Sequence, residues 1–282
     1  MIAQNIIKQW IDEARDIFCH YMPNAQNLMN NVKIVLVSEK HWRKVRSQIV
    51  IDIHSDQIDV DDTVMFETIH GKLGTVILLR QKFVREYYEF YKMLWHEMGH
   101  AYGIEYECPG ANFIRFNAPG LADERAQQEG YWLWQEFIAE CIANHVDNCY
   151  SKGNVEHNII VPSQRQIKEY LIQLITNSFM YFKYTMDEKS LGIYYATVLM
   201  DKDVINQSKE YSQSLHLTIM QGVDLNFHKA LNSIWEIFNK QVSTVQFWEV
   251  SSKTLDAIGE QILLMNNKKV SLMAQNTIAS LN

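Results

Sequence analysis

Trp95-His96-Glu97-Met98-Gly99-His100-Ala101-Tyr102-Gly103 is the stretch that decides the fold of this 282-residue chain. His96 and His100 stand four positions apart, which places both imidazoles on one face of a helix, one turn from each other. That separation suits two ligands of one tetrahedral zinc ion. Glu97 points about 100° further round the helix, where it can reach a metal-bound water without being a ligand itself. The stretch therefore predicts a zinc site with a carboxylate base, against the alternative of two surface histidines.

The residues around this motif favour a helix with an apolar back. The hydrophobic period changes to 3.6 residues from Val84 onward, and Gly103 is expected to end the helix. Five residues opposite the histidines are expected to enter the core: Tyr87, Tyr91, Leu94, Met98 and Ala101. The histidine side carries Glu89, Gly99 and Gly103, which predicts room for a metal and a substrate.

Ahead of the motif the sequence predicts one helix and a small sheet. The helix spans roughly Ile2 to Tyr21, and Pro23 closes it. Four β-rich runs follow, at Val32 to Val37, Gln48 to His54, Val64 to Ile69 and Thr75 to Arg80. The glycines of His70-Gly71-Lys72-Leu73-Gly74 suit a hairpin turn, so the sheet is expected to be at least partly antiparallel.

Behind the motif the chain reads as helical. A long loop is expected from Glu107 to Gly120, then a helix from Tyr131 to Asp147 and another that opens at Ser163-Gln164-Arg165-Gln166. The predicted fold class is therefore α+β. Residues 1–106 form an N-terminal part with a small mixed sheet and the metal-binding helix, and residues 107–282 form an α-helical part, the two making one catalytic unit.

The composition of the chain limits the classes of binding partner and the cellular location to be expected. The formal charge of −7 gives no electrostatic reason to expect nucleic acid or an anionic membrane. The first ten residues lack the pattern of a signal peptide, and no segment resembles a transmembrane helix, so a cytoplasmic location is expected. The four cysteines include no Cys-x-x-Cys pair, which predicts free thiols and no separate structural zinc site.

The motif and the order of elements resemble the zincin metallopeptidases, in which a mixed sheet and a His-Glu-x-x-His helix face a helical half. Among them, metzincins continue with a third histidine, but Tyr106 stands at that position here, and a neutral phenol is a poor zinc ligand. The resemblance is therefore to gluzincin-like members, whose third ligand is a glutamate on a later helix. It implies one Zn²⁺ per chain.

The segment Gln135-Glu136-Phe137-Ile138-Ala139-Glu140 is similar to that later helix. The resemblance implies that Glu136 is the third metal ligand and that Glu140 orients a ligand histidine. The alternative is that Glu136, Glu140 and Asp147 form a solvated face opposite an apolar stripe. Glu105 and Asp123 are the next candidates for the third ligand.

An oxyanion donor is expected on a further helix. Gly192-Ile193-Tyr194-Tyr195 is similar to the tyrosine-bearing helix of many gluzincin-like families, which makes Tyr194 and Tyr195 the candidate catalytic phenols. Paired aromatics are more often core residues, and three other candidates are Tyr131, His216 and His228. His145 lies on the apolar stripe and is expected to be a core histidine.

The resemblance implies a zinc-dependent peptidase in which Glu97 takes a proton from the attacking water. The segment Thr75 to Arg80 is expected at the edge of the cleft, where an extended peptide or protein substrate pairs with it. Two alternatives stay open. One is a narrowly specific regulatory protease that cuts a single partner protein, and the other is a zinc-binding protein of this fold that does not turn over.

Overall fold

The computed structural model describes residues 2–54, 65–71, 74–106, 122–153, 164–199, 208–223, 225–242 and 250–281. The chain divides into two compact units, the first made of Met1–Tyr106 with Ile138–Ile160 and the second of Glu107–Phe137 with Val161–Asn282. Helix α6 (Ala122–Gly153) thus gives its first half to the second unit and its second half, from Ile138, to the first. Within the described residues, no helix has the length and apolar character needed to cross a membrane.

The first unit is built on a small mixed sheet, which agrees with the predicted α+β class. Its described strands are β1 (Val32–Val37), β2 (Phe66–Gly71) and β3 (Gly74–Arg80). They lie in the order β1-β3-β2, with β1 parallel and β2 antiparallel to β3. The β2–β3 hairpin is confirmed, with Gly71 opposite Gly74. Gly74 has a φ of 115°, which only glycine adopts readily.

Strand β3 is central, so the expected edge position of Thr75 to Arg80 is wrong. Both sides of β3 are already paired, one with β1 and the other with β2. The last four residues of β3 are all buried and the first three of them are apolar, which is typical of a strand covered on both faces. Among the described strands, β1 and β2 each have a partner on one side only. An incoming peptide could pair with β2 but not with β3.

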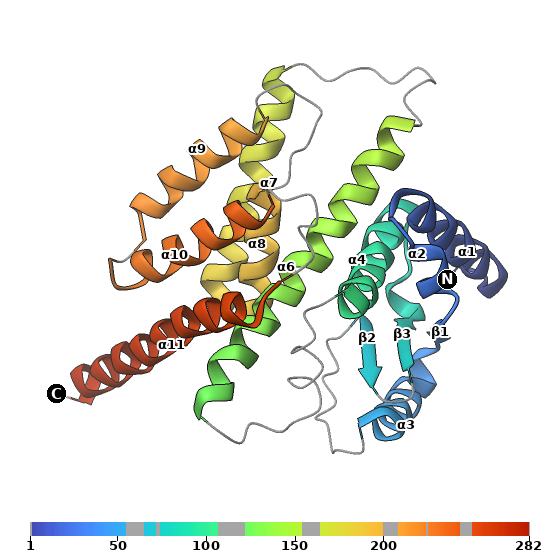
Figure 1. Ribbon diagram of the computed structural model, residues 1–282, viewed down its shortest axis with the longest axis horizontal. Helices are drawn as coiled ribbons and strands as arrows, with labels where there is room; N and C mark the ends of the chain where they lie inside the picture. Colours follow the sequence, from blue (N-terminus) through green and yellow to red (C-terminus); the bar gives the residue numbers. More distant parts are fainter. Residues whose placement is uncertain are drawn as a thin grey trace. The chain divides into compact units, whose positions relative to one another are not determined.

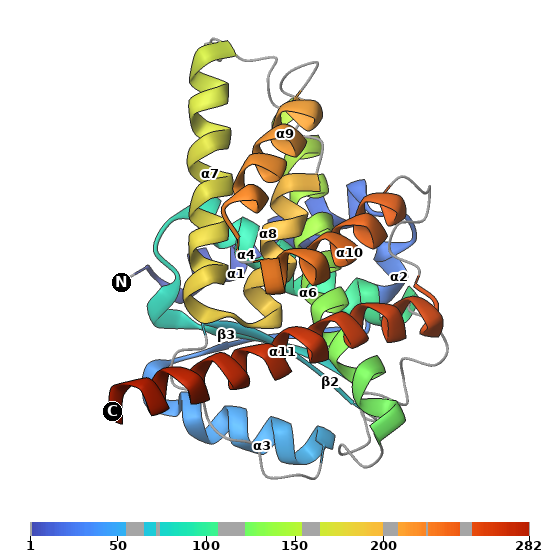
Figure 2. The ribbon, with the colours of Figure 1, turned by 90° about the vertical axis from the view of Figure 1, so that its left-hand side faces the viewer.

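Gln48 to His54 is not a strand, and that prediction is wrong. The residues end helix α3 (Trp42–His54), which follows a short 3-10 turn, η1 (Glu39–His41). Trp42, Val45 and Ile49 recur at helical spacing and pack on one sheet face against Val37, Ile69 and Leu78. This packing outweighs the local β-propensity of the isoleucine-rich run. Figure 2 shows α3 along one side of the strands, with α1 and α4 on the other.

The opposite sheet face carries α1 (Gln4–Tyr21), α2 (Ala25–Met29) and, after the 3-10 turn η2 (Gln81–Phe83), α4 (Tyr87–Tyr106). The expected helix from Ile2 to Tyr21 is α1, as Figure 1 shows. Side chains of α4 anchor it to its neighbours. Trp95 Nε1 donates to Ala14 O at 3.0 Å and Tyr91 OH to Glu13 at 2.6 Å.

The back of α4 is buried as predicted, except at its start. Tyr91, Leu94, Met98 and Ala101 have no exposed surface, whereas Tyr87 is 39% exposed. The helix continues through Gly103 to Tyr106, so the prediction that Gly103 ends it is wrong.

The glycines of α4 serve close packing against α6. A Cβ added to Gly99 would lie 2.8 Å from the carbonyl oxygen of Ala139 and 3.0 Å from its Cα, and one added to Gly103 would lie 3.3 Å from Ile138 Cγ2. The histidine side of α4 is therefore covered by α6 at these two positions, which corrects the expectation of open space there. The missing side chains let the two helix backbones come together.

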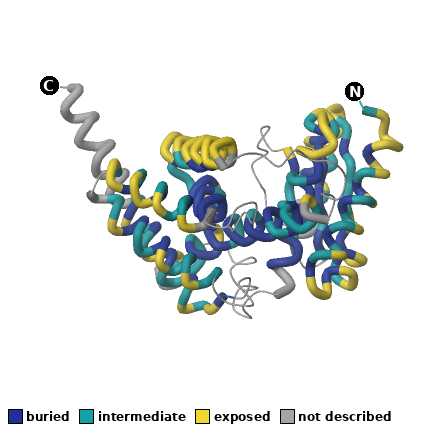
Figure 3. The backbone as a smooth tube through the Cα atoms, turned by 90° about the horizontal axis from the view of Figure 1, so that it is seen from above, coloured by how far each residue is buried: buried dark blue, intermediate teal, exposed yellow. Residues whose placement is uncertain are grey.

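The second unit is helical throughout its described residues, as expected. It contains α7 (Gln164–Thr185), α8 (Glu188–Leu199), α9 (Ser208–Gln221), α10 (Leu225–Gln241) and α11 (Ser252–Leu281). Neighbours pack as α7 with α8, α8 with α9 and α10 with α11. Figure 3 shows buried residues along inner helix faces and exposed ones along outer faces in each unit. The expected loop from Glu107 to Gly120 and the capping residue Ser163 lie outside the described residues.

We expect Gly99→Ala to lower the free energy of unfolding. The new methyl group meets rigid backbone at Ala139, and overpacking of this kind costs about 1–3 kcal/mol. Removing a helical glycine returns about 1 kcal/mol at most. Gly103→Ala is the matched control, because its methyl group meets only a side chain, and it should be neutral or stabilising. Urea unfolding of both variants measures the difference, and equal stability would contradict the proposed backbone contact.

Candidate metal centre

His96 and His100 converge on one point in front of α4. Their Nε2 atoms are 3.1 Å apart, and their rings stand at 86° to each other. A tetrahedral zinc ion with ligands at about 2.0–2.1 Å spaces two nitrogens by about 3.3 Å. The observed separation therefore matches the bite of one metal ion. His100 is 8% exposed, and the side chain of His96 is 13% exposed.

Glu140 fixes the other nitrogen of His96. His96 Nδ1 lies 3.0 Å from Glu140 Oε2, which favours the proton on Nδ1 and leaves the Nε2 lone pair for a metal. The carboxylate is itself held, because Asn144 Nδ2 donates to Glu140 Oε1 at 3.2 Å. Asn144 is 6% exposed. A chain of two hydrogen bonds therefore orients the first histidine.

Glu136 lies one helical turn before Glu140 on the same continuous helix. One ligand atom each from His96, His100 and Glu136 lie within 4.8 Å of one another. Two imidazoles and one carboxylate are a donor set that zinc commonly takes with a fourth position open. The residues present thus fit the expected metal.

Helix α8 packs against Glu136 within the second unit. A Cβ added to Gly192 would lie 2.9 Å from Glu136 Cβ, so glycine is needed for α8 to approach α6 here. Lys189, one turn earlier on α8, brings Nζ to 3.8 Å from Glu136 Oε1. This ammonium supplies a positive charge beside the carboxylate and keeps it from facing the helical core uncompensated.

Glu97 is almost fully buried and meets strand β2. It is 6% exposed. Thr68 Oγ1 lies 2.7 Å from Glu97 Oε2 and 2.9 Å from the backbone oxygen of Glu97. The helix therefore points this carboxylate toward the sheet side of the motif rather than into solvent.

The alternative of a solvated acidic face does not describe α6. The side chain of Glu136 is 18% exposed and that of Glu140 24%. Asp147 is 8% exposed, accepts a hydrogen bond from Tyr88 at 2.7 Å and pairs with Lys92 at 3.2 Å. The three acids instead face α4 or α8. The side chains of the other candidate ligands, Glu105 and Asp123, lie outside the described residues.

Tyr194 and Tyr195 are held inside the helical unit. Neither has exposed surface, and burial raises the pKa of both phenols above the usual range. Tyr194 OH lies 2.8 Å from His216 Nδ1, and Tyr195 OH donates to Leu231 O at 2.7 Å. Both hydroxyls thus have partners in the packing of α8 against α9 and α10. The residue of this segment that contacts Glu136 is Gly192.

The other oxyanion candidates are also placed by packing. Tyr131 is 1% exposed, and its hydroxyl accepts from Gln135 at 3.0 Å. His216 is fully buried and stacks on Trp235 with ring centroids 3.9 Å apart. His228 is half-buried beside it. His145, expected in the core, is half-buried, with Nε2 3.8 Å from Cys149 Sγ.

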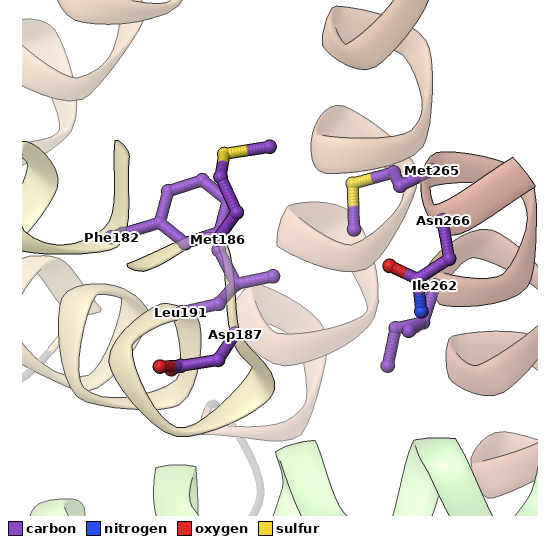
Figure 4. Close-up of a pocket in the computed structure, with 7 residues that line it drawn as sticks. All are labelled: Phe182, Met186, Asp187, Leu191, Ile262, Met265 and Asn266. Carbon is purple, nitrogen blue, oxygen red and sulfur yellow. The ribbon is translucent and has the colours of Figure 1, made fainter. Parts of the chain in front are cut away.

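A small cavity in the second unit offers no rival site. Figure 4 shows it between the α7–α8 turn, with Phe182, Met186, Asp187 and Leu191, and α11, with Ile262, Met265 and Asn266. Its volume of about 10 Å³ is room for roughly one water molecule. It cannot hold a substrate.

Three residues that contact the proposed centre, Thr68, Lys189 and Asn144, were not predicted from the His-Glu-x-x-His motif. Thr68 and Lys189 come from distant elements, β2 and α8, which local sequence patterns do not place beside α4 or α6. Asn144 could have been found, because it lies four positions after Glu140 on the same predicted helix. Compared with protein-family models, curated proteins and solved structures, the chain gives no match.

We expect replacements of the two α6 glutamates to weaken zinc binding in a fixed order. Glu136→Gln removes a charged oxygen from the proposed ligand set and should bind zinc most weakly. Glu140→Gln should cost about 10- to 100-fold in affinity, because it loosens the hold on His96. Glu129→Gln on the same helix is the control, since Glu129 is not in the proposed ligand set and its carboxylate lies 3.8 Å from Arg125 Nε. Competition with a chromophoric chelator gives the three affinities. Equal affinities would remove Glu136 from the ligand set.

His216 should make the fold less stable in mild acid. Burial, and secondarily the nearby His228, lower the pKa of His216 from 6.5 to about 4. Below pH 6.5 the unfolded chain therefore takes up a proton that the folded chain refuses, and the stability is lost progressively as the pH falls toward 4. The loss amounts to about 3 kcal/mol at most. His216→Gln should flatten this part of the curve of unfolding free energy against pH. An unchanged slope in that variant would assign the acid sensitivity to other groups.

Proposed function

We propose that the protein is a zinc-dependent metallopeptidase with Glu97 as its general base. The observation that carries the proposal is the convergence of His96 and His100, with Glu136 in reach and Glu140 bonded to His96 Nδ1. A pair of ordinary surface histidines would need neither the common focus nor the half-buried carboxylate behind one of them. The two histidines of α4 and the two glutamates of α6 therefore support a single metal site.

The architecture supports a gluzincin-like assignment within the zincin class. A mixed sheet lies against the helix that carries the histidines, and the third candidate ligand comes from a later helix. The acid four positions after that ligand bonds to a histidine, as the resemblance implies. These features support the proposed fold family as well as the donor set.

The chain's own groups divide the chemistry among them. A zinc ion, when bound, supplies a Lewis acid that lowers the pKa of a water toward about 7 and polarises a carbonyl group. His96, His100 and Glu136 would hold it, and Glu140 keeps the proton of His96 on Nδ1. Glu97 takes a proton from the attacking water and passes it to the leaving amine nitrogen, which completes the hydrolysis of a peptide bond. Tyr194 and Tyr195 have no role in this scheme, because their hydroxyls bond to His216 Nδ1 and Leu231 O.

Strand β2 favours an extended peptide as the substrate. It is an edge among the described strands, and Thr68 in its middle contacts the proposed base. A peptide that adds to such an edge gains main-chain hydrogen bonds and is held in an extended form. The scissile bond would then pass close to Glu97. This arrangement suits unfolded segments or flexible loops of proteins.

Glu97→Gln should abolish hydrolysis while the chain still binds one zinc. The amide keeps the size of the carboxyl group but cannot accept the proton, and general-base catalysis is worth about 10²- to 10⁴-fold. The measurement combines elemental analysis with cleavage of a panel of unrelated unfolded polypeptides, with and without chelator. Glu89→Gln, at an exposed position on the same helix, is the control.

The panel also separates the proposal from its alternatives. Broad cleavage that chelator stops supports a general peptidase. Cleavage of one partner protein alone indicates a narrowly specific protease. Zinc binding by the wild type without cleavage of any polypeptide would refute the enzymatic function, and full turnover by the Glu97→Gln variant would refute the role of Glu97.

A further inference from the structure

We infer that Thr68 is a positioning residue that holds the carboxylate of Glu97 in its working orientation. The inference rests on the proposed function and adds to it a residue outside the helical motif. Thr68 Oγ1 is 2.7 Å from Glu97 Oε2, a normal distance for a hydroxyl that donates to a carboxylate. Thr68 engages Oε2, so this hydrogen bond restricts rotation of the carboxylate about its side chain.

The backbone makes this contact well defined. Thr68 pairs with Ile77 of the central strand, which fixes its position along the sheet. Alternation along β2 turns Phe66 and Thr68 toward α4, where Phe66 meets Phe90 with ring centroids 5.7 Å apart. Glu67 and Ile69 turn the other way, toward Arg46 and Trp42. The Thr68 hydroxyl thus approaches Glu97 because of strand register rather than a chance side-chain rotamer.

The second acceptor of Thr68 locates the base relative to the sheet. Thr68 Oγ1 lies 2.9 Å from the backbone oxygen of Glu97, so one hydroxyl spans the main chain and the side chain of the same residue. A single proton serves one acceptor at a time. When the carboxylate is charged it is the stronger acceptor.

A purely structural reading is that Thr68 only ties β2 to α4. That reading predicts a loss of stability in any variant without the hydroxyl but no specific effect on turnover. A positioning role predicts more, because a carboxylate that can rotate away from the water is mispositioned for proton transfer. Misplacement of about 1 Å in a catalytic group can cost on the order of 100-fold in rate. The two readings therefore differ in kcat.

The decisive comparison is Thr68→Val against Thr68→Ser. Valine keeps the branched shape and suits a strand as well as threonine does, whereas serine keeps the hydroxyl. We expect Thr68→Val to retain one zinc per chain and an unchanged KM, with kcat reduced about 10- to 100-fold. Thr68→Ser should restore most of kcat. Thr75→Val is the matched control, because Thr75 lies in β3 and bonds to His70 rather than to Glu97.

A second readout does not depend on activity. Unfolding midpoints of the wild type, Thr68→Val, Glu97→Ala and the double variant form a cycle. We expect the double variant to lose less than the sum of the single losses, since the side-chain bond can be broken only once. Additive losses, or wild-type kcat in Thr68→Val with zinc retained, would overturn the inference. If the wild type cleaves nothing, the proposed function falls, and the cycle alone decides whether Thr68 holds Glu97.

Discussion

The backbone contact between Gly99 of α4 and Ala139 of α6 determines how close the glutamates of α6 lie to the histidines of α4 in the proposed metal centre. With a side chain at Gly99, α6 would stand further away, and Glu140 could not approach His96 Nδ1 to 3.0 Å. Glu136, one turn earlier on the same helix, would move with it. The donor set therefore depends on a position that binds nothing itself. The tyrosines and tryptophan behind α4 hold that helix in place against this contact.

The helix with the two histidines and the acidic residues of α6 could be predicted from local sequence patterns. The spacing of His96 and His100, together with the apolar residues opposite them, predicts helix α4. The four-residue spacing of Glu136 and Glu140 predicts that both side chains lie on the same face of α6. Both inferences need only helical geometry. The predicted end of α4 at Gly103 is wrong, because this glycine lies where α6 packs against α4. The local sequence does not distinguish a glycine that ends a helix from one that allows a second helix to approach closely.

Local sequence patterns could not predict the order of the strands or the side-chain contacts between distant elements. The apolar run in β3 indicates burial on both faces, but the expected edge position came from a family resemblance. In α3, the isoleucine-rich sequence favours a strand, but the segment folds as a helix because Trp42 and Ile49 then pack against the sheet. Tyr194 and Tyr195 match a motif by residue type, yet their hydroxyls bond to His216 and Leu231 O. Tertiary packing decides all three cases.

The apolar back of α4 also determines how the chain would respond to loss of the proposed metal. Tyr91, Leu94, Trp95 and Met98 have no exposed surface, and burying a large apolar side chain is worth about 1.5–3 kcal/mol. Small zinc domains lack such a core, and their fold appears and disappears with the ion. Here the helix that carries His96 and His100 is secured by hydrophobic burial on the side away from the ligands. Removal of the proposed zinc should therefore leave a folded chain that can bind the ion again, so loss of the ion would not by itself unfold the protein.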